Sequence, residues 1–109
     1  MVEYSERLDH IFASLADPTR RDILRRISRK ELSVGEIAKS YELTFAAVSK
    51  HLQVLERAKL VKKERRGREQ VVRVSLRALG EADRYLERYR VLWEERLDRL
   101  EEYLSKENK

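Results

Sequence analysis

The sequence predicts a mainly α-helical chain with one small β-hairpin. Apolar residues recur at three- and four-residue steps over most of the 109 residues, and this pattern gives way to extended segments only around Gly67. One Pro, three Gly and 41% charged residues suit helices with solvated faces. We expect a single domain over residues 1–109, because this length leaves no room for a second.

The first two helices are marked by apolar stripes and by capping residues. The first covers about residues 5–15, where Leu8, Ile11 and Phe12 share one face. Asp17 is a typical N-cap, and the proline that follows it is typical of a first helical position. The second helix therefore begins there and runs to about residue 29.

A helix-turn-helix is predicted over about residues 33–58. Ser33 and Glu36 have the spacing of a capping box, so a third helix starts there and ends near residue 41. Thr44 caps the fourth helix, whose inner face is apolar at Val48, Leu52 and Leu55. The turn between the two helices is only three or four residues long, which is the spacing of this motif.

A basic β-hairpin is expected next, over about residues 60–75. Extended segments at 60–63 and 71–75 flank a polar stretch. Gly67 suits a tight tip, where Arg65, Arg66 and Arg68 crowd around it. A helix-turn-helix followed by such a hairpin is a winged helix, whose second helix enters the DNA major groove while the wing grips the backbone or the minor groove.

The C-terminal part predicts one long helix, over about residues 78–104. Its apolar residues form a near-heptad seam, and the helix is longer than this small body can cover. We expect part of it to meet a second subunit, with packing back on its own domain as the alternative. The expected dimer interface, shared by the first and last helices, comprises Leu8, Ile11, Phe12, Leu86, Tyr89, Trp93, Leu97, Leu100 and Leu104.

Charge is unevenly distributed. The net charge is +5, but residues 44–77 alone carry ten basic and three acidic side chains. Such a segment is typical of a surface that neutralises phosphates, with a merely solvated face as the alternative. We therefore expect double-stranded DNA as the partner.

Several classes of protein are excluded. The chain has no Cys, which favours the cytoplasm, and no apolar run long enough to cross a membrane. His10 and His51 have no partner at metal-ligand spacing, and no nucleophile motif or phosphate loop occurs. We expect no catalytic residue, no metal site and no cofactor. Few Asn, Gln and Met residues resemble a thermophile's composition.

The recognition helix offers a defined set of groups to DNA. Ser49 can donate or accept a hydrogen bond, Gln53 suits adenine, and Lys50 suits phosphate. Phe45 either meets a thymine methyl group or packs over the turn. The full predicted set is Thr44, Phe45, Ala46, Ser49, Lys50, His51 and Gln53, with Arg65, Arg66, Gly67 and Arg68 in the wing.

Three stretches, at 15–24, at 33–38 and at 48–61, resemble the ArsR family of bacterial and archaeal repressors. Their key letters are LADPTRRDIL, SVGEIA and VSKHL, and the resemblance spans about residues 8–75. It implies a homodimeric winged-helix repressor whose first and last helices form the interface and whose fourth helix reads an inverted repeat.

The departures from the family pattern point to a branch that does not sense metals. Where metal sensors of the family carry Cys-x-Cys, this chain has Ser33 and Gly35, and no histidine follows His51. Phe45 stands where relatives commonly have Gln, and Glu42 replaces a turn glycine, which strains the backbone mildly.

We therefore expect a dimeric, sequence-specific transcriptional repressor that is not an enzyme. One alternative is an architectural DNA-binding protein of low specificity, and another is a winged-helix module for protein interaction. The sequence names no operator, regulated gene or small-molecule inducer.

Overall fold

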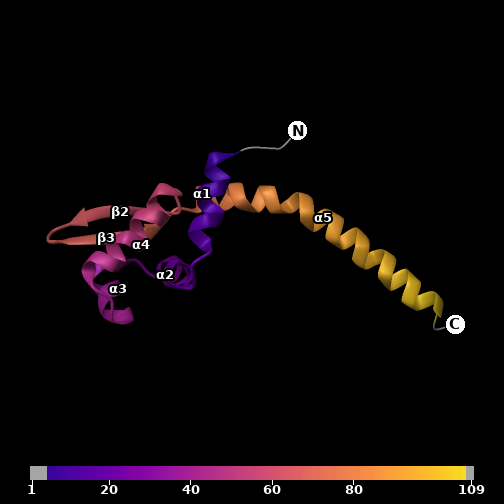
Figure 1. Ribbon diagram of the computed structural model, residues 1–109, viewed down its shortest axis with the longest axis horizontal. Helices are drawn as coiled ribbons and strands as arrows, with labels where there is room; N and C mark the ends of the chain where they lie inside the picture. The colour runs from indigo at the N-terminus through magenta and orange to yellow at the C-terminus, as the bar shows by residue number, and fades with distance from the viewer. Residues whose placement is uncertain (1–4, 108–109) are drawn as a thin grey trace. The chain divides into compact units, whose positions relative to one another are not determined.

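The computed structural model describes residues 5–107, and the chain divides into two compact units, residues 1–79 and 80–109, each described by itself. The elements follow one another in the predicted order, with one short strand added (Figure 1). They are α1 (Glu6–Leu15), α2 (Pro18–Arg29), β1 (Leu32–Ser33), α3 (Val34–Tyr41), α4 (Phe45–Arg57), β2 (Val61–Arg66), β3 (Glu69–Val74) and α5 (Leu76–Glu107). The mainly helical winged helix-turn-helix is confirmed.

The helices of the first unit begin where their capping residues predict. Each cap accepts a hydrogen bond from the backbone N–H three residues later, at 3.0 to 3.3 Å. The α3 cap is a full capping box, since the Glu36 carboxylate also accepts from the backbone N–H of Ser33 at 3.1 Å. The four caps are Ser5, Asp17, Ser33 and Thr44.

The sheet has three antiparallel strands in the order β1-β3-β2. The strand β1 was not expected, because two residues are too short to show an alternating pattern. The hairpin strands also run further toward the tip than predicted, with Arg66 paired to Glu69 across a two-residue turn. Gly67 has φ +62° at this turn, as expected.

Ion pairs explain why such charged segments form strands. Glu64 lies on the face of the hairpin that Arg66 and Arg73 share, at 3.2 and 3.8 Å from their guanidinium groups. Arg66 also reaches Glu31, just before β1, at 2.7 Å. Opposite charges that alternate across strands stabilise a pairing that hydrophobic periodicity alone does not reveal.

The core of the first unit centres on α4, which contacts α1, α2, α3 and β2. Val48, Leu52 and Leu55 are fully buried, as predicted. Ile11 is only 1% exposed within a single protomer. It belongs to the protomer's own core, so its assignment to the dimer interface is corrected. The other core side chains of 2% exposure or less include Ile23, Val34, Ile37, Leu60, Val61, Val72 and Ala78.

Two helices of this unit end on residues with left-handed backbone. Glu42 after α3 has φ 54°, and Lys59 after α4 has φ 64°. After α4, the N–H of Leu60 donates to the carbonyl of Leu55 at 3.0 Å, and the N–H of Lys59 donates to that of Glu56 at 2.9 Å. This Schellman pattern satisfies the last carbonyls of the helix and turns the chain directly into β2.

The second unit is formed by α5 from Gly80 onward. The helix starts two residues before the predicted 78 and ends three after 104. The seam residues that belong to this unit are exposed in one protomer: Leu86, Tyr89, Trp93, Leu97, Leu100 and Leu104, at 45% to 63%. Within residues 5–107, no helix combines the length and apolar character that crossing a membrane requires.

Replacing Glu42 with Gly is expected to stabilise the protein. A non-glycine residue in the left-handed region costs about 1–2 kcal/mol, and the greater freedom of glycine in the unfolded chain offsets about half of that gain. We predict that Glu42→Gly raises the free energy of unfolding by about 0.5–1 kcal/mol in urea titrations. Glu42→Ala keeps the strain and serves as the control. Equal stability of the two variants would contradict the strain at this turn.

Candidate nucleic-acid interface

The outer face of α4 is the surface that a winged helix presents to DNA. With its inner residues fully buried, α4 exposes Ala46, Lys50 and Gln53 on the opposite side, while Ser49 is half-buried between the two faces. Thr44 is exposed, but its hydroxyl accepts the N–H of Ala47 at 3.1 Å. Ala46, Ser49, Lys50 and Gln53 therefore lie along one side of α4, whereas the half-buried His51 lies toward α2.

Phe45 opens this face and is 61% exposed. It does not pack over the turn, so that alternative is wrong. Its neighbours line a small groove of about 220 Å³ that joins the start of α3 to the wing and includes Gly35, Arg68 and Gln70. An exposed aromatic ring at the first position of the recognition helix offers DNA an apolar contact rather than a hydrogen bond.

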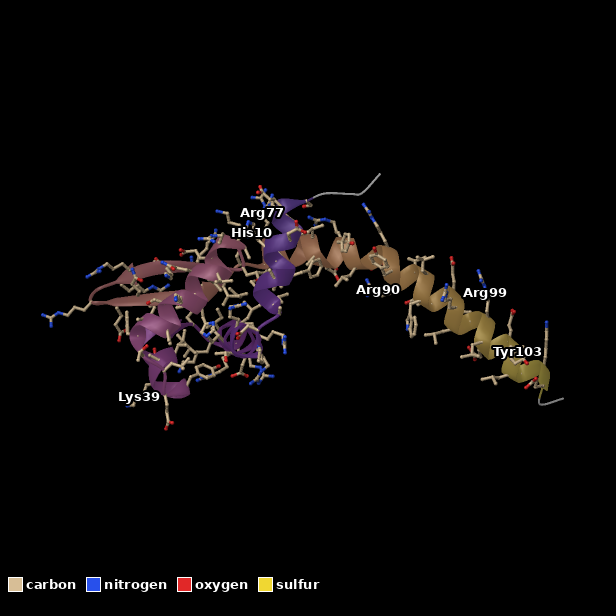
Figure 2. The ribbon with its side chains drawn as sticks, viewed as in Figure 1. His10, Lys39, Arg77, Arg90, Arg99 and Tyr103 are labelled. Carbon is tan, nitrogen blue, oxygen red and sulfur yellow. The ribbon has the colours of Figure 1, made fainter. Side chains whose placement is uncertain are left out.

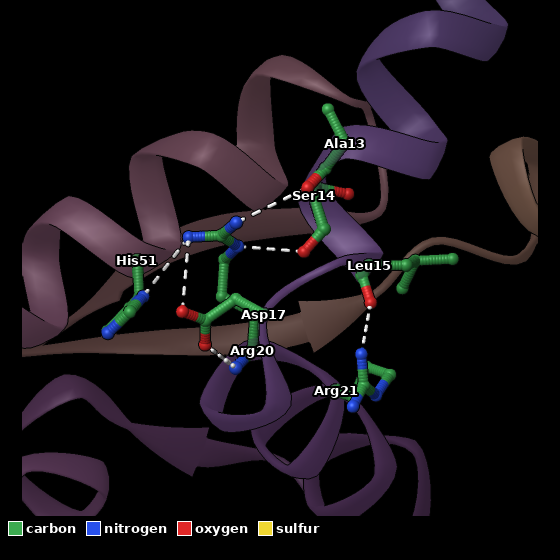
Figure 3. A network of polar contacts seen from close by, with 7 residues as sticks. All are labelled: Ala13, Ser14, Leu15, Asp17, Arg20, Arg21 and His51. Atoms are coloured by element: carbon green, nitrogen blue, oxygen red, sulfur yellow. Dashed lines mark hydrogen bonds and ion pairs between the residues drawn. The ribbon is translucent and has the colours of Figure 1, made fainter.

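Arg20 holds together three elements behind this face (Figure 3). Its Nε donates to the carbonyl of Ser14 at 2.7 Å, and its Nη2 to that of Ala13 at 3.3 Å, so it adds donors to two carbonyls in the last turn of α1. Its Nη1 lies 3.5 Å from Nδ1 of His51 on α4, and 3.9 Å from Asp17 at the start of α2. One guanidinium group thus fixes α1 and α2 against the recognition helix.

This network includes His51 of α4. Since arginine only donates, Nδ1 of His51 accepts, which places the ring proton on Nε2. The half-buried ring is therefore held by a neighbouring cation on the side of α2. The sequence predicts His51 to be a hydrogen-bonded structural residue or a phosphate donor rather than a metal ligand or a base, and this stays a prediction.

Carboxylates at α2 tie this helix to its surroundings. The backbone N–H of Arg20, and secondarily the Arg20 charge, lower the pKa of Asp17. Asp22 accepts a hydrogen bond from the Tyr41 hydroxyl at the end of α3 and pairs with Arg25 at 2.7 Å, and these two bonds lower the pKa of Asp22. The end of α3 is thereby fastened to α2 through Asp22.

The wing tip carries three arginines in two different states. Arg66 is held by Glu31 and Glu64, and these two carboxylates raise its pKa. Arg65 and Arg68 are exposed and make no ion pair within residues 5–107. Arg65 and Arg68 are therefore the tip arginines without a carboxylate partner among the described residues, a distinction that the sequence did not indicate.

Two parts of the interface were missed from the sequence. The Arg20 network depends on a residue whose partners are mostly backbone carbonyls, and no side-chain pattern predicts such contacts. Gln70 was treated as part of the loop, although it pairs with Arg65 near the tip. The sequence could have predicted the strand position of Gln70, since a two-residue turn at Gly67 places residues 65 and 70 opposite each other.

Comparison with known proteins decides the family. A model described as a helix-turn-helix domain matches residues 15–64. The transcriptional repressor SdpR of Bacillus subtilis is 30% identical over 60 residues, or 55% of this chain and 67% of SdpR. A crystal structure of the ArsR family transcriptional regulator RHA00566 is 33% identical, with a TM-score of 0.76 over 86% of this chain and 97% of that one. The chain belongs to the ArsR family.

This ArsR-family chain is thus a winged helix-turn-helix transcriptional regulator, and the family and fold are not those of an enzyme. The HTH-type transcriptional regulator Rv2034 of Mycobacterium tuberculosis is 45% identical over 53 residues, or 49% of this chain. The match spans half the length of Rv2034.

The residues of this chain do not fit the thiolate metal site known from other members of the family. Ser33 and Gly35 supply no thiolate, and the Ser33 hydroxyl accepts from the N–H of Glu36 in the α3 cap. Within the described residues, no group of three or more His, Asp or Glu side chains is placed to hold a metal ion.

Removing the Arg20 guanidinium is expected to destabilise the first unit. Arg20→Ala leaves the carbonyls of Ala13 and Ser14 without this donor, a loss of about 1–3 kcal/mol in the free energy of unfolding. Arg21→Ala is the matched control, since Arg21 makes one exposed bond to the carbonyl of Leu15. Urea unfolding followed by circular dichroism measures both. Equal losses in the two variants would contradict the bridging role of Arg20.

Proposed function

We propose that this protein is a homodimeric, sequence-specific repressor that reads an inverted-repeat operator and responds to no metal at the family's known sites. The observation that carries the proposal is the exposed face of α4, which lies opposite a fully buried face and beside a wing tip with two unpaired arginines. Two such helices related by a two-fold axis read half-sites about 34 Å apart.

Base contacts are assigned to the first turns of α4. Ser49 and Gln53 supply hydrogen-bonding groups, and Phe45 and Ala46 supply apolar contacts to thymine methyl groups. Lys50, Thr44 and His51 contact the backbone, as do the unpaired wing arginines.

The α5 seam is the proposed dimer surface. Its leucines and aromatics are about half exposed in one protomer, and Trp93 and Tyr89 line a shallow groove of about 550 Å³ on this helix. An apolar stripe of this length on a soluble helix favours burial against a second copy. Leu8 and Phe12 of α1 are assigned to the dimer interface as well, and the buried Ile11 is not.

An architectural role with little sequence preference is the second candidate. It is favoured by the exposed Phe45 at the first position of the recognition helix. An aromatic ring discriminates between bases less than an amide does. The two functions differ in specificity and share the same surface.

Selection from a random duplex library tests the proposal, followed by fluorescence anisotropy with the selected and a scrambled duplex. We expect an enriched inverted repeat that binds about a thousandfold or more tightly than the scrambled duplex. Equal affinity for both duplexes would instead establish the architectural role, and no binding at low salt would refute both.

The two unpaired wing arginines are expected to contact phosphate. Arg65→Ala combined with Arg68→Ala should weaken binding to all duplexes alike and reduce the slope of log affinity against log salt by about 1.8. Arg66→Ala is the matched control, because Glu31 and Glu64 already hold that side chain, and its slope should change by less than half as much. A double variant with the wild-type slope would contradict the assignment.

Breaking the seam is expected to separate the subunits. Leu97→Glu places a charge in the apolar stripe and should weaken dimerisation by about tenfold or more, because each buried leucine contributes about 2 kcal/mol. Val91→Glu is the matched control, since Val91 is similarly exposed at 47% but lies off the seam. Sedimentation velocity reads both. A Leu97→Glu protein that stays dimeric would exclude this surface.

A further inference from the structure

A second basic surface lies at the base of the wing, away from its tip. A groove of about 530 Å³ is formed there by one residue of α1, the end of α4, the start of β2 and the start of α5. Its lining side chains are Arg7, Glu56, Lys59, Val61, Lys62, Lys63, Ser75, Arg77 and Ala78. Figure 2 shows Arg77 close to α1, opposite the wing tip. We call this surface the basal groove.

The basal groove is strongly positive, and four of its five basic side chains have no carboxylate partner among the described residues. It gathers five basic side chains and one carboxylate, Glu56. The side chains of Lys59, Lys62, Lys63 and Arg77 make no ion pair or hydrogen bond within residues 5–107. Like charges gathered in a concave surface concentrate a positive potential that attracts anions.

The walls of the basal groove are held in place. The Schellman turn after α4 fixes Lys59 beyond the helix, and the N–H of Ser75 donates to the carbonyl of Leu60 at 2.7 Å, which closes the base of the hairpin. The floor is apolar and buried at Val61 and Ala78, which are 2% and 1% exposed. The cations therefore project from a fixed frame.

The place of the basal groove separates it from the DNA-reading surface. Its one α4 residue, Glu56, lies near the C-terminal end of a 13-residue helix, about 16 Å from Phe45 at 1.5 Å per residue. Its β2 residues lie in the first half of a six-residue strand, roughly 13–20 Å from Gly67 at the wing tip at about 3.3 Å per residue. The basal groove therefore lies at the end of α4 and the end of β2 that are distant from Phe45 and the wing tip. This position favours a ligand other than the duplex that α4 is proposed to read.

The dimensions and donors indicate the ligand's chemistry. A water takes about 30 Å³ of liquid volume, so 530 Å³ is far more than one oxyanion needs and lies in the range of small-molecule sites. Lysine ammonium and arginine guanidinium groups only donate, and they make charge-assisted bonds with phosphate and carboxylate oxygens. We propose that the basal groove binds a small polyanion with two or more phosphate groups. This site is independent of the proposed operator.

Isothermal titration calorimetry of the full chain with inorganic tripolyphosphate, at fixed ionic strength and without DNA, tests the proposal. We expect one tripolyphosphate per chain, bound at least about tenfold more tightly than sulfate. Lys62→Gln combined with Arg77→Gln should weaken this binding by about tenfold or more, and Lys62→Arg should retain it. Both substituted side chains are exposed, and thermal unfolding checks that the fold is kept.

The matched control removes the same charge elsewhere. Arg29→Gln combined with Lys30→Gln changes two exposed cations at the end of α2, outside the basal groove, and should leave tripolyphosphate binding within about twofold. Equal weakening in both double variants would show a response to net charge alone and overturn the proposal. So would an absence of tripolyphosphate binding to the wild type.

A DNA titration separates the two sources of phosphate. If Lys62→Gln with Arg77→Gln lowers the salt slope of duplex binding while the wild type ignores tripolyphosphate, the basal groove contacts the DNA backbone and the proposal is wrong. The calorimetry uses no DNA. It therefore tests tripolyphosphate binding even if the operator hypothesis is wrong.

Discussion

The burial of one face of α4 is the constraint on which the rest of this structure depends. Val48, Leu52 and Leu55 have no exposed surface, and α1, α2, α3 and β2 all pack against this helix. A helix buried so completely on one side has its other side fixed in register, because side chains on an α-helix repeat every 3.6 residues. The packing of the core therefore fixes which residues of α4 are exposed.

Much of this arrangement follows from the sequence because it rests on local rules. The caps at Asp17, Ser33 and Thr44, the helical stripes and the glycine at the wing tip each act over a few residues. What the sequence did not reveal depends on partners that are distant or made of backbone. The contact of Arg20 with two carbonyls and the bond from Tyr41 to Asp22 are of this kind, and so is the short strand β1.

The distribution of charge in residues 44–77 also could not be predicted fully from the sequence. The ten cations of this segment predicted a single phosphate-binding surface, yet the fold divides them among separate places. One group is exposed on α4 and at the wing tip and comprises Lys50, Arg65 and Arg68. A second group, Arg66 and Arg73, pairs with carboxylates. A third group lines the basal groove and comprises Lys59, Lys62, Lys63 and Arg77. A count along the chain cannot make this division, because the hairpin and the turn after α4 bring distant residues together.

The bond between Arg66 and Glu31 also bears on how the wing meets its target. It joins the end of β2 to the residue before β1, and so ties the tip to the body of the first unit. A hairpin restrained in this way loses less conformational entropy on association than a free one. A smaller part of the binding free energy is therefore needed to order the loop. In the proposed complex with DNA, Arg65 and Arg68 are thus carried on a tip that is already restrained.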